Sequence, residues 1–186
     1  AGSPFAAPGQ PYGISLGDVD GDGDLDIATA NRTGDNVSIF LNNGVGTYTA
    51  ATGSPFTAGS QPYSAKFGDV DGDGDLDVVT SNQTGGNLSV LLNNGLGSYS
   101  TAPGSPFAAG TNPIDVVLGD VDGDGDLDIA STSNTNTSVV VLLNNGSGNY
   151  SAAPGSPFAV GAAGGSLGIA FADVDGDGDL DIATGN

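Results

Sequence analysis

One nine-residue motif, Asp-Val-Asp-Gly-Asp-Gly-Asp-Leu-Asp, occurs four times in this chain of 186 residues and constrains its fold more than any other feature. The copies begin at Asp18, Asp69, Asp120 and Asp173, at intervals of 51, 51 and 53 residues. Two other motifs keep the 51-residue interval, with Ser-Pro-Phe ending at Phe5, Phe56, Phe107 and Phe158 and Asn-Asn-Gly ending at Gly44, Gly95 and Gly146. A fixed period of this length is typical of an array of one supersecondary unit.

Each repeat carries the sequence pattern of four short β-strands. Apolar residues alternate with other residues at 14–17, before the first Asp motif, and again at 25–28, where the motif ends. A third apolar segment covers residues 37–41, and a fourth surrounds Tyr48. No segment has helical periodicity, so we expect an all-β chain of four-stranded units of the kind that form propeller blades.

The connections between these strands carry turn residues. Asn-Asn-Gly-x-Gly, after the third strand, predicts a hairpin because Asn and Gly tolerate the positive φ angles of a type I′ turn. The Ser-Pro-Phe segment is expected to link successive blades as a turn or an edge, since proline cannot donate to a strand ladder and blocks strand pairing. The predicted boundaries are residues 1–10 for the end of a preceding unit, 11–61 for blade 1, 62–112 for blade 2, 113–165 for blade 3 and 166–186 for the first half of blade 4.

The charge of the chain is concentrated in the four motifs. All 22 acidic residues are aspartates, 20 of them in the motifs, and only Arg32 and Lys66 oppose them, which gives a net charge of −20. Such a chain repels nucleic acid and anionic membranes, and no apolar stretch approaches the length of a membrane span. Histidine and cysteine are absent, which removes the usual ligands of zinc, copper and haem and the commonest general base.

The spacing of the carboxylates matches the oxygen ligands of a Ca²⁺ loop, an ion that takes about six to eight oxygens. Side chains at positions 1, 3, 5 and 9 and the backbone carbonyl at position 7 would supply ligands, and Gly at position 6 permits the sharp turn. The position-7 side chain, Asp24 in the first copy, is expected to point to solvent. We expect one Ca²⁺ per copy, four in all, among Asp18, Asp20, Asp22, Asp24, Asp26, Asp69, Asp71, Asp73, Asp75, Asp77, Asp120, Asp122, Asp124, Asp126, Asp128, Asp173, Asp175, Asp177, Asp179 and Asp181.

Other interpretations of the motif fit less well. An EF-hand needs Glu at position 12, where this chain has Thr29, Thr80, Ser131 and Thr184. Mg²⁺ suits so many protein oxygens less well than Ca²⁺ does. Aspartate pairs also serve glycosidases, but those need one carboxyl of raised pKa in a cleft, whereas these aspartates recur in every repeat. A solvated acidic turn is the remaining alternative, and four identical copies argue against it.

At these residues the sequence resembles the FG-GAP/VCBS repeat family, which is related to the calcium-binding blades of integrin α-subunits. The family pattern, Asp-x-Asp-x-Asp-Gly-x-x-Asp followed by an apolar strand, is matched at residues 18–27, 69–78, 120–129 and 173–182. The resemblance covers nearly the whole chain and implies a β-propeller with Ca²⁺ in the hairpin between the first two strands of a blade. It also implies an extracellular location, secreted or at the cell surface, and a role in adhesion, carbohydrate binding or scaffolding.

The number of repeats departs from that of a closed propeller. Three complete units and a truncated fourth fall short of the roughly four to eight blades that close a ring. Three arrangements are open: a fragment of a longer array, two chains that close a ring together, or a filament in which each copy completes its neighbour's blade. The expected partners are therefore other copies of the chain or neighbouring repeats.

Two function classes fit these features. The first is a non-catalytic structural or adhesive module that binds Ca²⁺, since no nucleophile–base pair stands out. The second is a lectin-like propeller in which Tyr12, Tyr48, Tyr63, Tyr99 and Tyr150 stack on sugars, although repeated tyrosines more often pack between blades. Glycans and cell-surface proteins are further candidate partners.

Asn-x-Ser/Thr sequons give candidate glycosylation sites. Two pairs of them, Asn31 with Asn82 and Asn36 with Asn87, keep the 51-residue period and are expected in the loop between the second and third strands. The full set is Asn31, Asn36, Asn82, Asn87, Asn136, Asn145 and Asn149.

Overall fold

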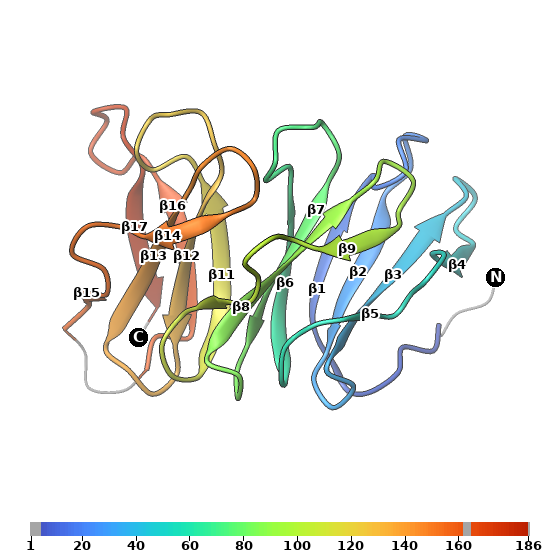
Figure 1. The fold of residues 1–186 in the computed structure, drawn as a ribbon, viewed down its shortest axis with the longest axis horizontal. Coiled ribbons are helices and arrows are strands. Elements are labelled where there is room, and N and C mark those ends of the chain that lie inside the picture. Colours follow the sequence, from blue (N-terminus) through green and yellow to red (C-terminus); the bar gives the residue numbers. More distant parts are fainter. Residues whose placement is uncertain (1–4, 162–164, 186) are drawn as a thin grey trace.

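The computed structural model describes residues 5–161 and 165–185, and every regular element in those ranges is a β-strand. The all-β class expected from the sequence is confirmed. Figure 1 shows the strands gathered into successive sheets that lie side by side in an open array. In the described part of the chain there is no helix of the length and apolarity that crossing a membrane requires.

Each complete repeat forms one antiparallel sheet of five strands. Blade 1 consists of β1 (Pro11–Gly17), β2 (Asp26–Asn31), β3 (Asn36–Asn42), β4 (Tyr48–Ala50) and β5 (Phe56–Thr57). Blade 2 consists of β6 (Pro62–Gly68), β7 (Asp77–Asn82), β8 (Asn87–Asn93), β9 (Tyr99–Thr101) and β10 (Phe107–Ala108). Blade 3 consists of β11 (Pro113–Gly119), β12 (Asp128–Ser133), β13 (Ser138–Asn144), β14 (Tyr150–Ala152) and β15 (Phe158–Ala159). The hairpin of β16 (Gly168–Ala172) and β17 (Asp181–Gly185) forms the start of a fourth blade.

The fifth strand corrects the expectation for the Ser-Pro-Phe segment. The sequence predicts an unpaired link there, whereas Val37 of β3 pairs with Phe56 of β5. β4 covers the other end of β3, where Asn42 pairs with Tyr48. The prediction is wrong because Pro55 lacks an N–H only at its own position, so the residues after it can return to the same sheet edge.

The apolar cores lie between adjacent blades. We call the surface of a blade that faces the next blade its back face and the opposite surface its front face. In the first interface the back face of blade 1 contributes Val19, Ala28, Ala30, Val37 and Ile39. The front face of blade 2 contributes Ala65, Phe67, Leu76, Val78 and Leu91. The interface between blades 2 and 3 and that between blade 3 and the β16–β17 hairpin repeat this arrangement, so each blade is stabilised by its neighbours.

The front face of blade 1 has no such neighbour among the described residues. Ile14 is 63% exposed and Leu16 is 56% exposed. By contrast Ala65 and Val116, which occupy the position of Ile14 in blades 2 and 3, are 1% and 0% exposed. Blade 1 therefore presents to solvent the surface that its successors bury.

Gly13 lies at a close approach of blades 1 and 2, where β1 lies beside β6 (Figure 1). A Cβ atom at Gly13 would lie 2.7 Å from both the Cα atom of Ser64 and the carbonyl oxygen of Tyr63. These are backbone atoms and cannot rotate away, so only glycine fits without moving a blade.

We expect Gly13→Ala to lower the free energy of unfolding by about 1–3 kcal/mol, the usual range for overpacking. The equivalent position in the fourth unit supplies the control, because a Cβ atom at Gly168 would meet nothing within 4 Å. Urea denaturation of both variants measures the effect. Equal destabilisation by Gly13→Ala and Gly168→Ala would show that the contact between the blades is not the cause.

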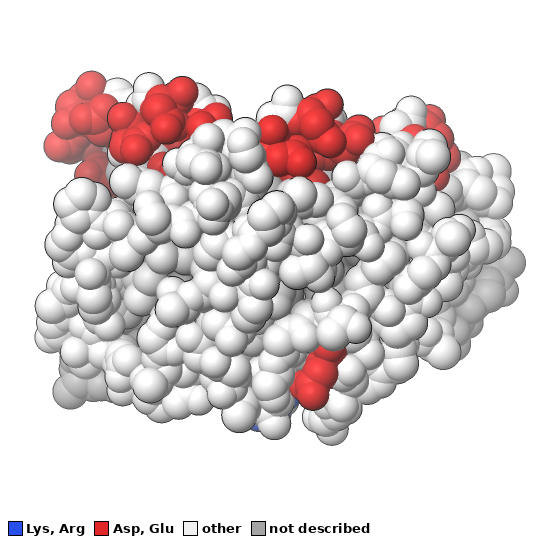
Figure 2. Space-filling view, in the orientation of Figure 1, with Lys and Arg blue, Asp and Glu red and all other residues white. Residues whose placement is uncertain are grey.

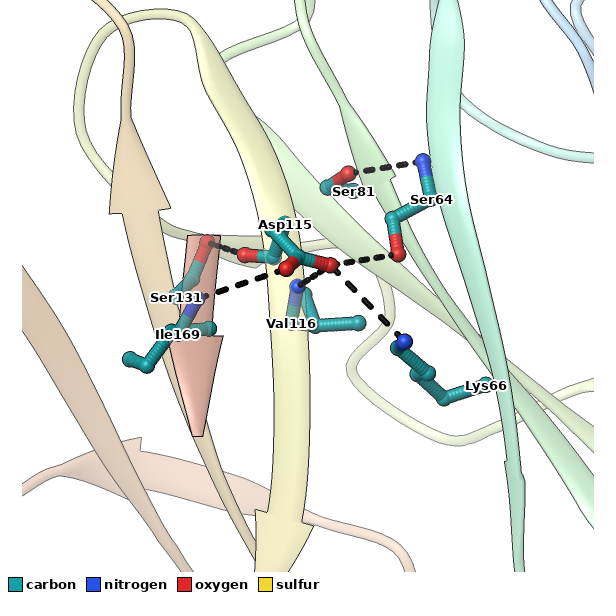
Figure 3. Close-up of polar contacts among 7 residues, drawn as sticks. All are labelled: Ser64, Lys66, Ser81, Asp115, Val116, Ser131 and Ile169. Atoms are coloured by element: carbon teal, nitrogen blue, oxygen red, sulfur yellow. Dashed lines mark hydrogen bonds and ion pairs between the residues drawn. The ribbon is translucent and has the colours of Figure 1, made fainter. Parts of the chain in front are cut away.

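Asp115, on β11, joins the first strands of three blades, β6, β11 and β16 (Figure 3). Its Oδ1 accepts a hydrogen bond from the Ser64 hydroxyl at 3.0 Å and lies 3.9 Å from Lys66 Nζ, both on β6. Its Oδ2 accepts a hydrogen bond from the backbone N–H of Ile169 on β16 at 3.4 Å. Asp115 occupies in blade 3 the position of Ser64 in blade 2, so equivalent residues of adjacent blades meet here.

A second contact of this kind involves the other cationic residue. Arg32 Nη2 donates a hydrogen bond to Gln83 Oε1 at 3.1 Å, and the two residues are 51 positions apart. The guanidinium carbon of Arg32 also lies 5.1 Å from the ring centroid of Tyr12.

Candidate metal centre

Each Asp motif forms the loop between the first two strands of a blade, and Figure 2 shows the carboxylates gathered along one edge of the array. The first aspartate organises the loop. Asp18 Oδ1 accepts hydrogen bonds from the backbone N–H groups of Gly21 at 2.8 Å and Asp22 at 3.1 Å, and its Oδ2 accepts one from Gly23 at 2.9 Å. Gly21 and Gly23 have φ angles of 75° and 92°, a region that glycine adopts most easily. The motif therefore winds its backbone around its own first side chain.

The last aspartate of the motif is anchored in the sheet. Asp77, the first residue of β7, is fully buried, as are Asp26 and Asp128 at the same position of blades 1 and 3. Asp77 Oδ1 accepts a hydrogen bond from the backbone N–H of Asn93, and Oδ2 accepts one from Val70, both at 2.8 Å. Backbone hydrogen bonds within the sheet thus fix the position-9 carboxylate.

The predicted ligand positions converge in all four loops. In every loop three carboxylates each offer one oxygen, and these oxygens all lie within 4.8 Å of one another. The groups are Asp18, Asp20 and Asp22; Asp69, Asp71 and Asp77; Asp120, Asp122 and Asp128; and Asp173, Asp175 and Asp181. Positions 1 and 3 occur in every group, joined by position 5 in the first and position 9 in the others. Each group therefore holds three of the four side chains expected to bind the ion, and leaves out position 9 in the first loop and position 5 in the others.

The position-7 side chains belong to none of these groups. Asp24 is half-buried, and a Cβ atom on Gly44 would collide with its carboxylate. Asp75 and Asp126 take the same place beside Gly95 and Gly146. In blades 1 to 3 this side chain therefore lies against the Asn-Asn-Gly turn and does not point freely to solvent as expected. Only in the fourth loop is it exposed, at Asp179.

The electrostatics of the loops favour a bound cation. Burial raises the pKa of Asp77 to about 7, although hydrogen bonds from the backbone N–H groups of Asn93 and Val70 lower it in part. Burial, followed by the charges of neighbouring aspartates, also raises the pKa of Asp71. The Oδ1 atoms of Asp20 and Asp71 are buried without a hydrogen-bond partner. Carboxylate oxygens that lack a donor and resist ionisation fit a dication that would bind them directly.

The repeats agree with a known family. A family model for the FG-GAP-like repeat matches residues 18–80, 69–131 and 120–184. The chain belongs to the FG-GAP-like repeat family. Each match runs from one Asp loop into the second strand of the next blade, so every FG-GAP match contains one interface between blades.

The likeness to a solved lectin structure supports a propeller-like fold for these FG-GAP repeats. An Agrocybe aegerita lectin that recognises non-reducing terminal N-acetylglucosamine is 26% identical with a TM-score of 0.59, and the match covers 91% of this chain and 45% of that chain. The Photorhabdus luminescens Tc holotoxin pore is 22% identical with a TM-score of 0.55, covering 93% of this chain and 8% of that chain. The V. cholerae biofilm matrix protein Bap1 is 19% identical with a TM-score of 0.43, covering 95% and 28%.

This FG-GAP chain spans less than half the length of the lectin chain that it matches. No curated protein sequence matches it.

The FG-GAP fold determines which sequon asparagines are exposed enough to carry a glycan. Asn31 and Asn82, expected in a loop, are the last residues of β2 and β7 and are fully buried. Asn31 Nδ2, the atom that would carry a glycan, donates hydrogen bonds to Asn36 Oδ1 and Ser38 Oγ, both at 2.8 Å. These contacts argue against glycans at Asn31 and Asn82 in the folded chain. Asn36, Asn87 and Asn136 are half-buried, and the exposed candidates are Asn145 and Asn149.

In the presence of a chelator, we expect the free energy of unfolding of the FG-GAP array to fall as the pH rises from about 4 to about 8. The pKa of Asp77 is raised from 3.8 to about 7 by folding, so the ion-free fold favours the protonated carboxyl. The stabilisation that this protonated carboxyl provides is complete below its pKa in the unfolded chain. It is lost as the pH rises through its pKa in the folded chain, about 7. Chemical denaturation at several pH values measures this. A rise in stability over the same range would contradict the assignment, and Asp77→Asn should flatten part of the fall.

Proposed function

We propose that this chain is a non-catalytic calcium-binding module of extracellular proteins, with one Ca²⁺ in each of its four Asp loops. The convergence of three carboxylate oxygens within 4.8 Å in every loop carries the proposal. Asp18, Asp20, Asp22 and Asp26 would hold the ion in blade 1 together with the carbonyl of Asp24, and the equivalent residues would do so in the other blades. Ca²⁺ is favoured over Mg²⁺ because it accepts more protein oxygens in a less regular geometry.

Calcium titration of the full chain by isothermal titration calorimetry, with magnesium as the competing ion, tests this proposal. We expect four Ca²⁺ per chain and weaker binding of Mg²⁺. Absence of calcium binding at millimolar concentrations, the range of extracellular modules, would overturn it.

An extracellular structural or adhesive role is supported by the same features. The acidic side chains lie almost entirely in the loops, so they serve the ion and leave the blade surfaces nearly uncharged (Figure 2). The proposal includes no catalytic activity, because the aspartates that recur in the repeats serve the loops and no nucleophile–base pair stands out in the sequence.

The exposed front face of blade 1 is evidence for a binding partner that is itself a blade. Phe5, Tyr12, Ile14, Ile27 and Phe40 line an apolar groove of about 430 Å³ on this face. In the interfaces within the chain, the same face is covered by the back face of the preceding blade. We therefore propose that a back face, supplied by a second copy of the chain or by a neighbouring repeat, occupies this groove.

Analytical ultracentrifugation over a range of chain concentrations tests the version with a second copy. We expect association that Leu16→Asp weakens, because Leu16 is 56% exposed on the free front face. Val45→Asp is the control, since Val45 is 82% exposed and its equivalent in blade 2, Leu96, stays 71% exposed although a preceding blade covers the front face there. A chain that stays monomeric at every concentration would exclude association of copies.

A lectin-like function is the second candidate, supported by the likeness to the Agrocybe aegerita lectin. The structure reduces the number of tyrosines that could stack on a sugar. Tyr99 and Tyr150 are buried, and their rings lie 5.3 Å from those of Phe56 and Phe107 between blades. Tyr48 packs on Phe5 in the same way.

The remaining pair, Tyr12 on β1 and Tyr63 on β6, have ring centroids 4.7 Å apart. A glycan array with the full chain and a Tyr12→Ala/Tyr63→Ala variant tests this candidate. Binding that the variant loses would favour the lectin, and an empty array would favour the structural role.

A further inference from the structure

Asn93, the first residue of the Asn-Asn-Gly turn in blade 2, contacts the metal loops of two blades. Its side chain is 6% exposed. The Nδ2 group donates hydrogen bonds to the carbonyl of Leu76 in its own loop at 3.2 Å and to the carbonyl of Val19 in blade 1 at 2.8 Å. Val19 lies between Asp18 and Asp20, two of the candidate ligands of loop 1. One amide group therefore bridges loops 1 and 2.

The backbone of the same residue holds a candidate ligand of loop 2. The N–H of Asn93 donates to Asp77 Oδ1 at 2.8 Å, and the N–H of Val70 donates to Asp77 Oδ2 at 2.8 Å. Hydrogen bonds to an ionised carboxylate are roughly twice as strong as neutral ones. Asn93 is thus a positioning residue that fixes Asp77 with its main chain and Val19 with its side chain.

The hydrogen-bonded series continues into blade 3. Asn144 Nδ2 donates to the carbonyl of Val70 at 2.8 Å, and the backbone N–H of Asn144 donates to Asp128 Oδ1 at 2.8 Å. The N–H of Gly148 donates to the same Val70 carbonyl at 2.9 Å. Because Val70 also donates to Asp77, an unbroken series of hydrogen bonds runs from loop 1 to loop 3.

We propose that Asn93 and Asn144 couple the metal loops of blades 1, 2 and 3, so that calcium binding at one loop raises the affinity of the next. This inference rests on the calcium binding proposed above. A loop of five carboxylates must adopt one conformation to bind an ion. When the neighbouring loop is already ordered, its valine carbonyl holds the asparagine, and with it the position-9 carboxylate, in place. The second binding step then loses less conformational freedom, which produces positive cooperativity.

The fourth loop should bind independently. In blades 2 and 3 the bridge comes from the Asn-Asn-Gly turn after the third strand, and the described part of the fourth unit contains only the β16–β17 hairpin. The array is therefore expected to contain three coupled sites and one independent site.

Native mass spectrometry of the full chain at calcium concentrations below saturation tests the coupling, because it resolves chains with different numbers of bound ions. For the wild type we expect partly filled states of the coupled sites to be depleted about fivefold or more relative to independent binding, the lower end of typical coupling. The Asn93→Ala/Asn144→Ala variant should restore the statistical distribution.

Asn42→Ala is the matched control. Asn42 makes the same contacts within blade 1, through its N–H to Asp26 Oδ1 at 2.7 Å and its Nδ2 to the Leu25 carbonyl at 3.2 Å, and it contacts no preceding loop among the described residues. This variant should keep the wild-type distribution. Independent statistics in the wild type, or equal loss of coupling in Asn42→Ala, would overturn the inference. No bound calcium in any chain would overturn the proposed function itself.

A second measurement does not depend on the asparagine variants folding normally. Asp71→Ala/Asp73→Ala disables loop 2, and Asp175→Ala/Asp177→Ala disables loop 4. Calorimetric titration should show that the affinity of loops 1 and 3 falls about fivefold or more in the first variant, and that the affinity of loops 1 to 3 is unchanged in the second. Unchanged affinity after the loss of loop 2 would exclude coupling while leaving calcium binding intact.

Discussion

Chelation of calcium with EGTA is expected to lower the melting temperature of this chain by more than about 10 °C. With calcium ten- to a hundredfold above Kd, each site adds roughly 1.4–2.7 kcal/mol to the free energy of unfolding by mass action. Four such sites add roughly 6–11 kcal/mol, and 1 kcal/mol shifts the melting temperature of a domain of this size by about 2–4 °C. The effect is large because the cores between the blades consist mostly of Ala, Val and Leu side chains. Each of these side chains buries little area, so the ions supply a large share of the stability.

Thermal unfolding followed by circular dichroism measures this shift. Calcium added in excess of the chelator is the control and should restore the higher melting temperature, whereas magnesium at the same concentration should restore less of it. A melting curve that does not change on chelation would contradict calcium as a structural ion of this fold.

Asp77→Ala is expected to lower the free energy of unfolding by about 2–6 kcal/mol in calcium and to remove one bound ion. The substitution leaves the buried N–H groups of Asn93 and Val70 without an acceptor, and each unsatisfied donor costs about 1–3 kcal/mol. Urea denaturation and calorimetric ion counting measure the two effects. In chelator the loss should be smaller, because burial raises the pKa of Asp77 and makes its charged form unfavourable without an ion.

Asp75→Ala is the control from the same loop. Its carboxylate lies against Gly95 and belongs to no convergent group, and position 7 is assigned a ligand role through its carbonyl only. The change in stability should stay within about 0.5 kcal/mol, and all four ions should remain. Equal losses from Asp75→Ala and Asp77→Ala would show that the ligand positions are assigned wrongly.

The loops and strands could be predicted from the sequence because their causes are local. The alternation around residues 14–17 and 25–28 and the glycines of the Asp motif fix the hairpin within a few residues of chain. The resemblance at residues 18–27 then implied the blade. The return of Phe56 to the edge of β3 could not be predicted in this way, because it depends on where the sheet edge lies after the turn.

Contacts between blades account for most of what the sequence did not reveal. Asn93 is predicted only as a turn residue, although its 51-residue recurrence, shared with Asn42 and Asn144, was a signal of a common role. The bridge to Val19 spans 74 residues and appears only when the blades are stacked. The burial of Asn31 has a different origin, since its amide bonds Asn36 and Ser38 on the neighbouring strand of the same sheet, and a sequon is a local pattern that does not show this pairing.

The meeting of equivalent residues in adjacent blades limits how uniform such an array can become. Ser64 faces Asp115, and Arg32 faces Gln83, each pair 51 positions apart. If every repeat carried aspartate at the position of Asp115, or arginine at the position of Arg32, two like charges would meet at every junction between blades. Like charges so close repel each other. Duplication of a single unit therefore yields a workable tandem array only if these two positions diverge or stay neutral. A consensus sequence averaged over the copies would need uncharged residues at both.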